Sequence, residues 1–147
     1  MKPTSNEPIL LVEDNAGDAE LTMMAFERQG LARRVVHVRD GVEAMDFLLR
    51  RNAFEGRSTP APALVFLDLK MPMLDGFVVL RDIRAHAGIG HIPVVVLTSS
   101  NEAGDRRRAY EAGANAYMCK PVDFVEFMEA MRCTCQFWTQ VNQRAPD

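Results

Sequence analysis

The sequence predicts a single α/β domain with a doubly wound fold: five parallel strands in one sheet, ordered 2-1-3-4-5, with helices on both faces. Three observations predict it. Five short apolar runs alternate strictly with segments of helical periodicity. The runs are mostly continuous in apolar residues, as in strands that are covered on both faces. The chain has 147 residues, enough for one domain with a core and too few for two ordinary ones.

The predicted strands are short and rich in Val, Ile and Leu, the composition expected of buried parallel strands. In chain order they are Ile9–Val12, Val35–Val38, Ala63–Leu67, Pro93–Leu97 and Ala116–Cys119.

The segments between the strands carry apolar residues three and four positions apart, which predicts helices with one buried face. In chain order they are Asp18–Gln29, Gly41–Arg51, Asp75–His86, Glu102–Ala112 and Val122–Gln140. Gly30 and Gly113 follow the first and fourth of them, where glycine typically ends a helix. Asp18 is interpreted as a helix cap, and the stretch 52–62, with two prolines and a glycine, as a long polar connection.

Composition and charge exclude several classes of function. The net charge of -3 provides no basic patch for nucleic acid. No apolar run approaches the roughly 18 residues of a membrane-spanning helix, and the first eight residues are too polar for a signal peptide. The three cysteines, Cys119, Cys133 and Cys135, are an odd number without a paired framework, which favours reduced thiols in the cytoplasm. None of them has the CxxC spacing of zinc or redox sites.

Polar residues stand at the ends of four predicted strands. Glu13 and Asp14 follow the first strand, Asp68 the third and Lys120 the fifth, while Thr98 follows the fourth. In such sheets the carboxyl ends of the strands share one edge, and ligands bind there near the switch point between strands one and three. The sequence therefore predicts a site that combines three acids, a hydroxyl and an ammonium.

The residue types at this edge indicate phosphoryl chemistry with a metal ion. Three neighbouring carboxylates repel one another, and a divalent cation relieves that repulsion. Oxygen ligands without histidine or cysteine favour a hard ion, magnesium above others. Lys120 and Thr98 suit phosphoryl oxygens. Asp68 is central in the set and is the candidate nucleophile, which would form an acyl phosphate.

Four short motifs carry a family resemblance. They are Glu13–Asp14, Asp68–Gly76, Thr98–Ser99 and Lys120–Pro121. In this order and spacing they resemble the signature of response-regulator receiver domains (CheY-like domains), and the resemblance covers about Pro8 to Gln140.

The resemblance implies a role for each motif residue. Asp68 accepts a phosphoryl group from a phosphohistidine of a sensor histidine kinase. Asp14 and Asp68 ligate Mg²⁺ directly, Glu13 acts through water, and the backbone carbonyl of Lys70 adds a ligand; Mn²⁺ can replace Mg²⁺. Lys120 pairs with the phosphoryl group.

The same resemblance implies a switch. Thr98 moves to hydrogen-bond the phosphoryl group, and Tyr117 matches the aromatic residue that turns inward when it does. The Lys120–Pro121 bond resembles the family's cis peptide, which would aim the ammonium at the site.

The connection 52–62 and the ending Phe137–Val141 are similar to those of single-domain regulators paired with cyanobacterial and bacterial phytochrome kinases. Several of these form dimers through the fourth helix, fifth strand and fifth helix. Phe137 and Trp138 are neighbours that point about 100° apart on a helix, so both cannot face one core. They are expected to face a partner, and a homodimer is the natural one.

By this resemblance the chain is one receiver domain over residues 8–140, with flexible tails 1–7 and 141–147 and no output domain. It would signal through protein contacts, including relay to a histidine phosphotransfer protein, rather than act as an enzyme on other substrates. A degenerate receiver serving as a scaffold is the alternative. An aspartyl-phosphate hydrolase is less favoured because Lys70 stands where that class needs a second carboxylate. Glu13 and Asp14 would repel a flavin phosphate.

Overall fold

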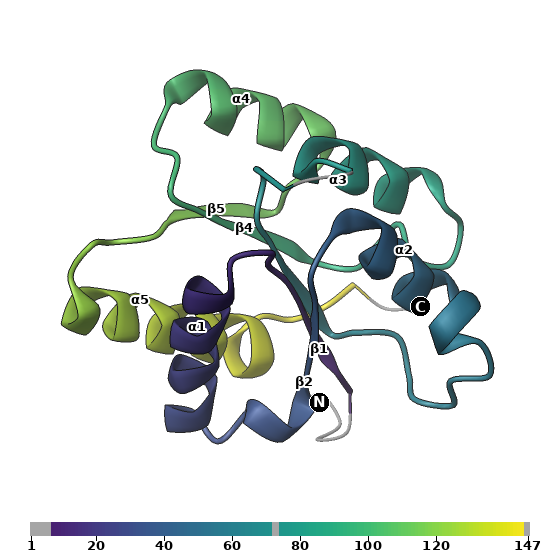
Figure 1. Ribbon diagram of the computed structural model, residues 1–147, viewed down its shortest axis with the longest axis horizontal. Helices are drawn as coiled ribbons and strands as arrows, with labels where there is room; N and C mark the ends of the chain where they lie inside the picture. Colours follow the sequence, from purple (N-terminus) through teal and green to yellow (C-terminus); the bar gives the residue numbers. More distant parts are fainter. Residues whose placement is uncertain (1–6, 72–73, 146–147) are drawn as a thin grey trace.

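A computed structural model of the protein describes residues 7–71 and 74–145. One sheet of five parallel strands, in the order β2-β1-β3-β4-β5, confirms the predicted topology (Figure 1). The strands are β1 (Ile9–Val12), β2 (Val35–Val38), β3 (Leu64–Leu67), β4 (Val94–Thr98) and β5 (Ala116–Cys119).

Within residues 7–71 and 74–145, five α-helices connect and follow the strands. They are α1 (Ala16–Arg28), α2 (Gly41–Leu49), α3 (Gly76–Ala85), α4 (Ala103–Ala112) and α5 (Phe124–Gln136). Short 3₁₀-helices, η1 (Ala32–Arg34) and η2 (Asn52–Phe54), follow α1 and α2. Among the described residues, no helix has the length and apolar character needed to cross a bilayer.

The sheet is buried on both faces, which explains its continuous apolar strands. Helices α1 and α5 cover one face, and α2, α3 and α4 lie on the other (Figure 1). On the α1–α5 face, Phe26 packs edge-on against Phe66 of β3, with ring centroids 5.5 Å apart. Successive side chains of a strand point to opposite faces of the sheet, and both are buried. Leu10, for example, lies in the core beneath α2 and α3, and Leu11 in the core beneath α1 and α5.

The end of the chain differs from the single long helix predicted over 122–140. Helix α5 ends at Gln136, and a π-helix, η3 (Phe137–Val141), continues it. In this segment the Thr139 hydroxyl donates to the Cys135 carbonyl at 2.6 Å. Trp138 packs against the α1–α5 cluster, whereas Phe137 is 44% exposed. The two rings also pack edge-on against each other, with centroids 5.1 Å apart, and Phe137 is the more exposed of the pair.

Arg84, near the end of α3, connects four backbone and side-chain groups. Its guanidinium donates to the carbonyls of Gly113 (2.9 Å), Gly90 (3.1 Å) and Ile92 (2.7 Å), and to Asn115 Oδ1 (2.6 Å). These acceptors lie just before β4 and just after α4. Arg84 therefore joins the C-terminal end of α4 to α3 and to the start of β4.

Gly76 begins α3 directly against the end of β3. Its N–H donates to the Leu69 carbonyl at 2.9 Å, and Asp75 caps the helix by accepting from Val78 N at 3.1 Å. A Cβ at Gly76 would stand 2.4 Å from the backbone oxygen of Asp68. The absence of a side chain at Gly76 thus allows the helix to begin where the central acid of the site is placed.

We expect Gly76→Ala to destabilise the protein, because its methyl group would clash with backbone rather than with a flexible side chain. The free energy of unfolding should fall by about 1–3 kcal/mol, measured by urea denaturation with circular dichroism. Gly104→Ala is the matched control, since nothing lies within 4 Å of a Cβ at Gly104 in α4. Equal stability of the two variants would contradict this packing constraint.

Candidate functional site

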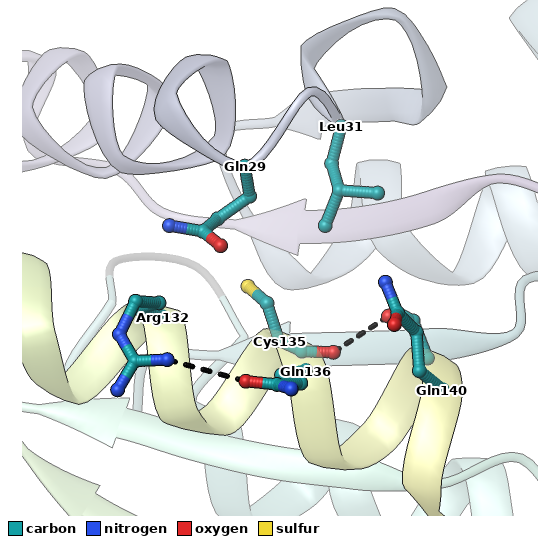
Figure 2. A pocket seen from close by; sticks show the side chains of 7 residues that line it. Gln29, Leu31, Arg132, Cys135, Gln136 and Gln140 are labelled. Atoms are coloured by element: carbon teal, nitrogen blue, oxygen red, sulfur yellow. Dashed lines mark hydrogen bonds between the residues drawn. The ribbon is translucent and has the colours of Figure 1, made fainter.

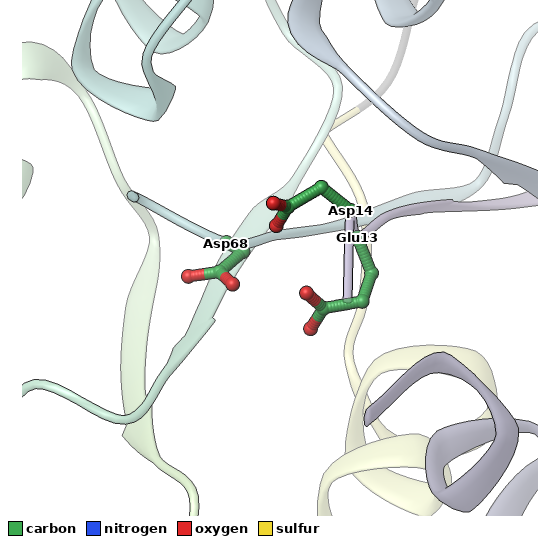
Figure 3. A group of neighbouring side chains, drawn as sticks. All are labelled: Glu13, Asp14 and Asp68. Carbon is green, nitrogen blue, oxygen red and sulfur yellow. The ribbon is translucent and has the colours of Figure 1, made fainter. Parts of the chain in front are cut away.

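Three carboxylates meet at the carboxyl ends of the two central strands. Glu13 and Asp14 follow β1, and Asp68 follows β3. The Asp68 N–H donates to the Val12 carbonyl at 3.1 Å, which holds the ends of the two strands together. One oxygen from each acid lies within 4.8 Å of the others. Figure 3 shows the three side chains gathered at this edge. Glu13 is buried, Asp68 partly buried and Asp14 exposed, so the group opens to solvent on one side.

Lys120 brings the ammonium to this group from the end of β5. Its Nζ lies 2.5 Å from Glu13 Oε1, 3.1 Å from Asp18 Oδ2 and 3.7 Å from Asp68 Oδ2. Its backbone N–H donates to the Thr98 carbonyl at 2.7 Å, which fixes the residue beside β4. The side chain is only 11% exposed. A nearly buried cation is therefore shared among three acids.

Burial and the neighbouring charges shift the pKa values of Glu13 and Lys120. Burial, reinforced by repulsion from Asp68, raises the pKa of Glu13 to about 7 although Lys120 opposes the shift. Burial alone would lower the pKa of Lys120, but the hydrogen bond to Glu13 and the charge of Asp68 outweigh it and raise that pKa. Lys120 stays charged, and one ammonium does not balance the carboxylates around it.

The Lys120–Pro121 peptide bond is trans, so the prediction of a cis bond from the family resemblance was wrong. The trans form is favoured by about 0.5–1 kcal/mol before proline in general. Lys120 already reaches Glu13 and Asp68 from a trans peptide, so this geometry requires no cis bond to direct the ammonium.

Thr98 and Tyr117 are both hydrogen-bonded to the backbone of Ser100. Thr98 is buried at the end of β4, and its hydroxyl oxygen accepts from Ser100 N at 3.3 Å. The Tyr117 hydroxyl, from β5, donates to the Ser100 carbonyl at 2.9 Å. Ser100 Oγ in turn donates to Asp105 Oδ2 of α4 at 2.5 Å. One loop therefore joins the candidate switch residues to the N-terminal turn of α4.

Lys70 connects Asp68, at the end of β3, to helix α4. Its backbone N–H donates to Asp68 Oδ1 at 3.4 Å, and its ammonium lies 3.6 Å from Asp105 Oδ2. The hydrogen bond from Ser100 and the charge of Lys70 lower the pKa of Asp105. Because the Lys70 side chain is 65% exposed, this ion pair is a weak surface contact rather than a buried anchor.

Sequence reasoning missed Asp18, which was interpreted as a helix cap. Asn15 is the cap instead: its Oδ1 accepts from Asp18 N at 2.8 Å. Helix α1 consequently begins at Ala16, and Asp18 lies in its first turn, from which it reaches Lys120. A signal was present, because side chains of a first turn point back toward the start of the helix, and this helix begins two residues after Asp14.

A hollow of about 170 Å³ lies away from the acidic group, between the end of α1 and the α5–η3 segment (Figure 2). Its lining residues are Gln29, Leu31, Arg132, Cys135, Gln136, Thr139 and Gln140. Arg132 is already paired with Glu129 at 2.6 Å and with Gln136 Oε1 at 3.2 Å. Burial raises the pKa of the Cys135 thiol to about 12, which keeps it unreactive. None of the predicted site residues lines this hollow.

The carboxylate group fits a hard divalent cation. Three oxygens from different residues lie within 4.8 Å of one another, no nitrogen or sulfur ligand is among them, and their charges exceed that of the neighbouring Lys120. Oxygen-only sets with carboxylates and open, solvent-facing positions are typical of Mg²⁺ and Mn²⁺ sites.

The raised pKa of Glu13 predicts a pH-dependent stability of the metal-free protein. Glu13 binds its proton more tightly in the folded state (about 7) than in the unfolded chain (4.5), so its contribution to folding stability falls as pH rises from about 4.5 to 7. Glu13→Gln should remove this decline. Urea unfolding in EDTA at several pH values measures it, with Glu20→Gln, an exposed change on α1, as the control. Parallel pH profiles for wild type and Glu13→Gln would refute the assignment.

Comparison with known proteins identifies relatives of the chain that agree with the geometry of the acidic site. The family described as response regulator receiver domain matches residues 9–132. A probable methanogenesis regulatory protein, FilR2 of Methanothrix harundinacea, is 41% identical over 135 residues, covering 92% of this chain and 85% of its own. Response regulator Rcp1 of Synechocystis is 34% identical over 142 residues, with 95% of each chain covered.

Solved structures agree with the sequence relatives. The Mn²⁺-bound form of Rcp1 superposes with a TM-score of 0.85 at 31% identity, covering 95% of this chain and 99% of the other. The phosphorylated cyanobacterial phytochrome response regulator RcpA gives a TM-score of 0.87 at 32% identity, covering 96% and 99%. With the matched sheet order and the acidic edge of the sheet, these similarities establish that the chain belongs to the response regulator receiver domain family of two-component signalling.

Proposed function

We propose that this receiver accepts a phosphoryl group on Asp68 and passes on its phosphorylation state through protein contacts. The observation that carries the proposal is the position of Asp68, with Glu13 and Asp14 on one side and the Lys120 ammonium 3.7 Å away. Family members receive phosphoryl groups from donors such as histidine kinases, and a phosphohistidine is the proposed donor here.

The transfer forms one bond and breaks another. A carboxylate oxygen of Asp68 attacks the phosphorus in line, and the P–N bond to the donor imidazole breaks, with its electron pair returning to the nitrogen. Lys120 stabilises charge on the transferring oxygens, as cationic donors do in phosphoryl transfer. The chain thereby promotes its own phosphorylation, and attack of water on the acyl phosphate later resets it.

Asp14 and Asp68 would hold Mg²⁺ directly, with Glu13 acting through water and the backbone carbonyl of Lys70 as a further ligand. In that position an ion would supply positive charge to offset the charge that develops on the phosphoryl oxygens. The mutual approach of the three carboxylates supports this assignment, and the Mn²⁺-bound form of Rcp1 supports Mn²⁺ as a substitute.

Phosphorylation would act through Thr98. The acyl phosphate adds roughly two negative charges, and the Thr98 hydroxyl would move to donate a hydrogen bond to them. Because Ser100 N donates to that hydroxyl, and Tyr117 is bonded to the Ser100 carbonyl, movement of Thr98 disturbs both. The Ser100–Asp105 hydrogen bond then transmits the change to α4.

Partners are proposed on two grounds. The similarity to RcpA, a phytochrome response regulator, supports a phytochrome-type histidine kinase as donor, and a histidine phosphotransfer protein as a further relay. Exposed Phe137 and Tyr110, 44% and 51% exposed, support a homodimer through α4, β5 and α5. Lys70 occupies the position where aspartyl-phosphate hydrolases need a second acid, so hydrolysis of other substrates is not favoured.

The acceptor is tested by intact mass after incubation with acetyl phosphate and Mg²⁺. We expect wild type to gain one phosphoryl group, and Asp68→Asn to gain none because an amide is not a nucleophile for phosphorus. Asp82→Asn on α3, the same chemical change away from the site, should behave as wild type. Phosphorylation that persists in Asp68→Asn would place the acceptor elsewhere.

The switch is tested with Thr98→Ala. We expect this variant to take up the phosphoryl group but to lose the phosphorylation-dependent change in amide hydrogen exchange across residues 99–105, because no hydroxyl links the acyl phosphate to Ser100. Thr139→Ala, which removes another buried threonine hydroxyl, is the control. A full exchange response in Thr98→Ala would show that Thr98 does not transmit the signal.

A further inference from the structure

Among the residues that the structure describes, Asp18 is the one carboxylate paired with Lys120 that does not belong to the acidic group of Glu13, Asp14 and Asp68. Within the described part of the chain, Lys120 Nζ pairs with three carboxylates, and the Asp18 distance, 3.1 Å, lies between those to Glu13 and Asp68. The three donors of an ammonium can thus each be directed at a different acid. Asp18 approaches from helix α1, whereas the other two follow strands.

Helix α1 holds Asp18 in this place from both sides. The Asp18 N–H donates to Asn15 Oδ1 at 2.8 Å, and its carbonyl accepts from the Thr22 hydroxyl at 2.8 Å. The backbone of Asp18 is therefore fixed in the first turn, and only the short side chain is free to rotate. The Asp18 side chain is 45% exposed at the edge of the site, while the Lys120 side chain is 11% exposed.

The charges around Lys120 give Asp18 a distinct role. Glu13 and Asp68 belong to the group whose oxygens fit a divalent cation, and any cation held there competes with Lys120 for their charge and repels its ammonium. Asp18 is not a member of that group, so its attraction for Lys120 is retained under the same conditions. A lysine side chain has four rotatable bonds and needs such an anchor to present one N–H in a fixed direction.

We propose that Asp18 is a positioning residue that holds the Lys120 ammonium at Asp68, ready to contact the incoming phosphoryl group. This proposal rests on the proposed function, since it assigns the orientation of a group that acts in it. Asp18 touches neither phosphorus nor Asp68 and acts only through Lys120.

A double-mutant cycle tests the proposal. The rate of phosphorylation by acetyl phosphate with Mg²⁺ is measured for wild type, Asp18→Asn, Lys120→Ala and the double variant. Asp18→Asn should slow the reaction about tenfold, because a misplaced charge loses much of its effect on transfer. In the Lys120→Ala background the same change should alter the rate by less than about twofold, the ordinary scatter of independent sites. Glu20→Gln, the same charge change on α1, should not alter either rate.

Chemical labelling of lysine gives a readout that needs neither metal nor phosphoryl donor. The chain has three lysines, Lys2, Lys70 and Lys120, and Lys70 serves as internal reference. In Asp18→Asn, acetylation of Lys120 by an N-hydroxysuccinimide ester, followed by peptide mass spectrometry, should be about two- to fivefold faster, as loss of a partly exposed ion pair allows. Lys70 should label at an unchanged rate.

The outcomes separate the two ideas. If Asp18→Asn slows phosphorylation equally with and without Lys120, or leaves Lys120 labelling unchanged, the positioning role is overturned while the acceptor function stands. If wild type takes up no phosphoryl group, the proposed function fails, and the labelling experiment alone decides whether Asp18 holds Lys120.

Discussion

The arrangement of this molecule depends on a concentration of negative charge at the edge of a sheet that is buried on both faces. Glu13, Asp14 and Asp68 approach one another within 4.8 Å, and Lys120 is the ammonium that meets them. Such an edge is unfavourable by itself, because like charges repel and burial disfavours each of them. The raised pKa of Glu13 is the direct sign of that imbalance. A cation that binds here would relieve the repulsion among the carboxylates, and a phosphoryl group would find the Lys120 ammonium close to Asp68.

Topology brings this charge together. Because β1 and β3 are neighbours at the centre of the sheet, residues more than 50 positions apart come within contact distance. The ends of β4 and β5 add Thr98 and Lys120, joined by the hydrogen bond from Lys120 N to the Thr98 carbonyl. Local packing then refines the positions, as at Gly76, where the absence of a side chain lets α3 begin against Asp68. Site and fold are thus specified by the same residues.

Continuous apolar strands and regular helix periodicity made the sheet order and the acidic edge predictable, since both follow from position along the chain. What depended on contacts was not predictable. Asp18 was interpreted as a cap because its residue type suits a cap, whereas Asn15 takes that role and frees it for Lys120. The π-helix after Gln136 escaped prediction because its residues keep a helical pattern and differ only in hydrogen bonding. The prediction of a cis bond before Pro121 was wrong because it came from the family resemblance, whereas the bond in this chain is trans.

Arg84 gives helix α4 two unlike ends. At its C-terminal end the Arg84 guanidinium donates hydrogen bonds to the Gly113 carbonyl and to Asn115 Oδ1. At the N-terminal end, Asp105 is connected through Ser100 and the exposed Lys70. In the proposed switch, a displacement near Thr98 would reach α4 at its first turn, through Ser100 and Asp105. The hydrogen bonds of Arg84 would hold the opposite end of the helix in place, so the surface around the first turn of α4 is where a partner would sense the change.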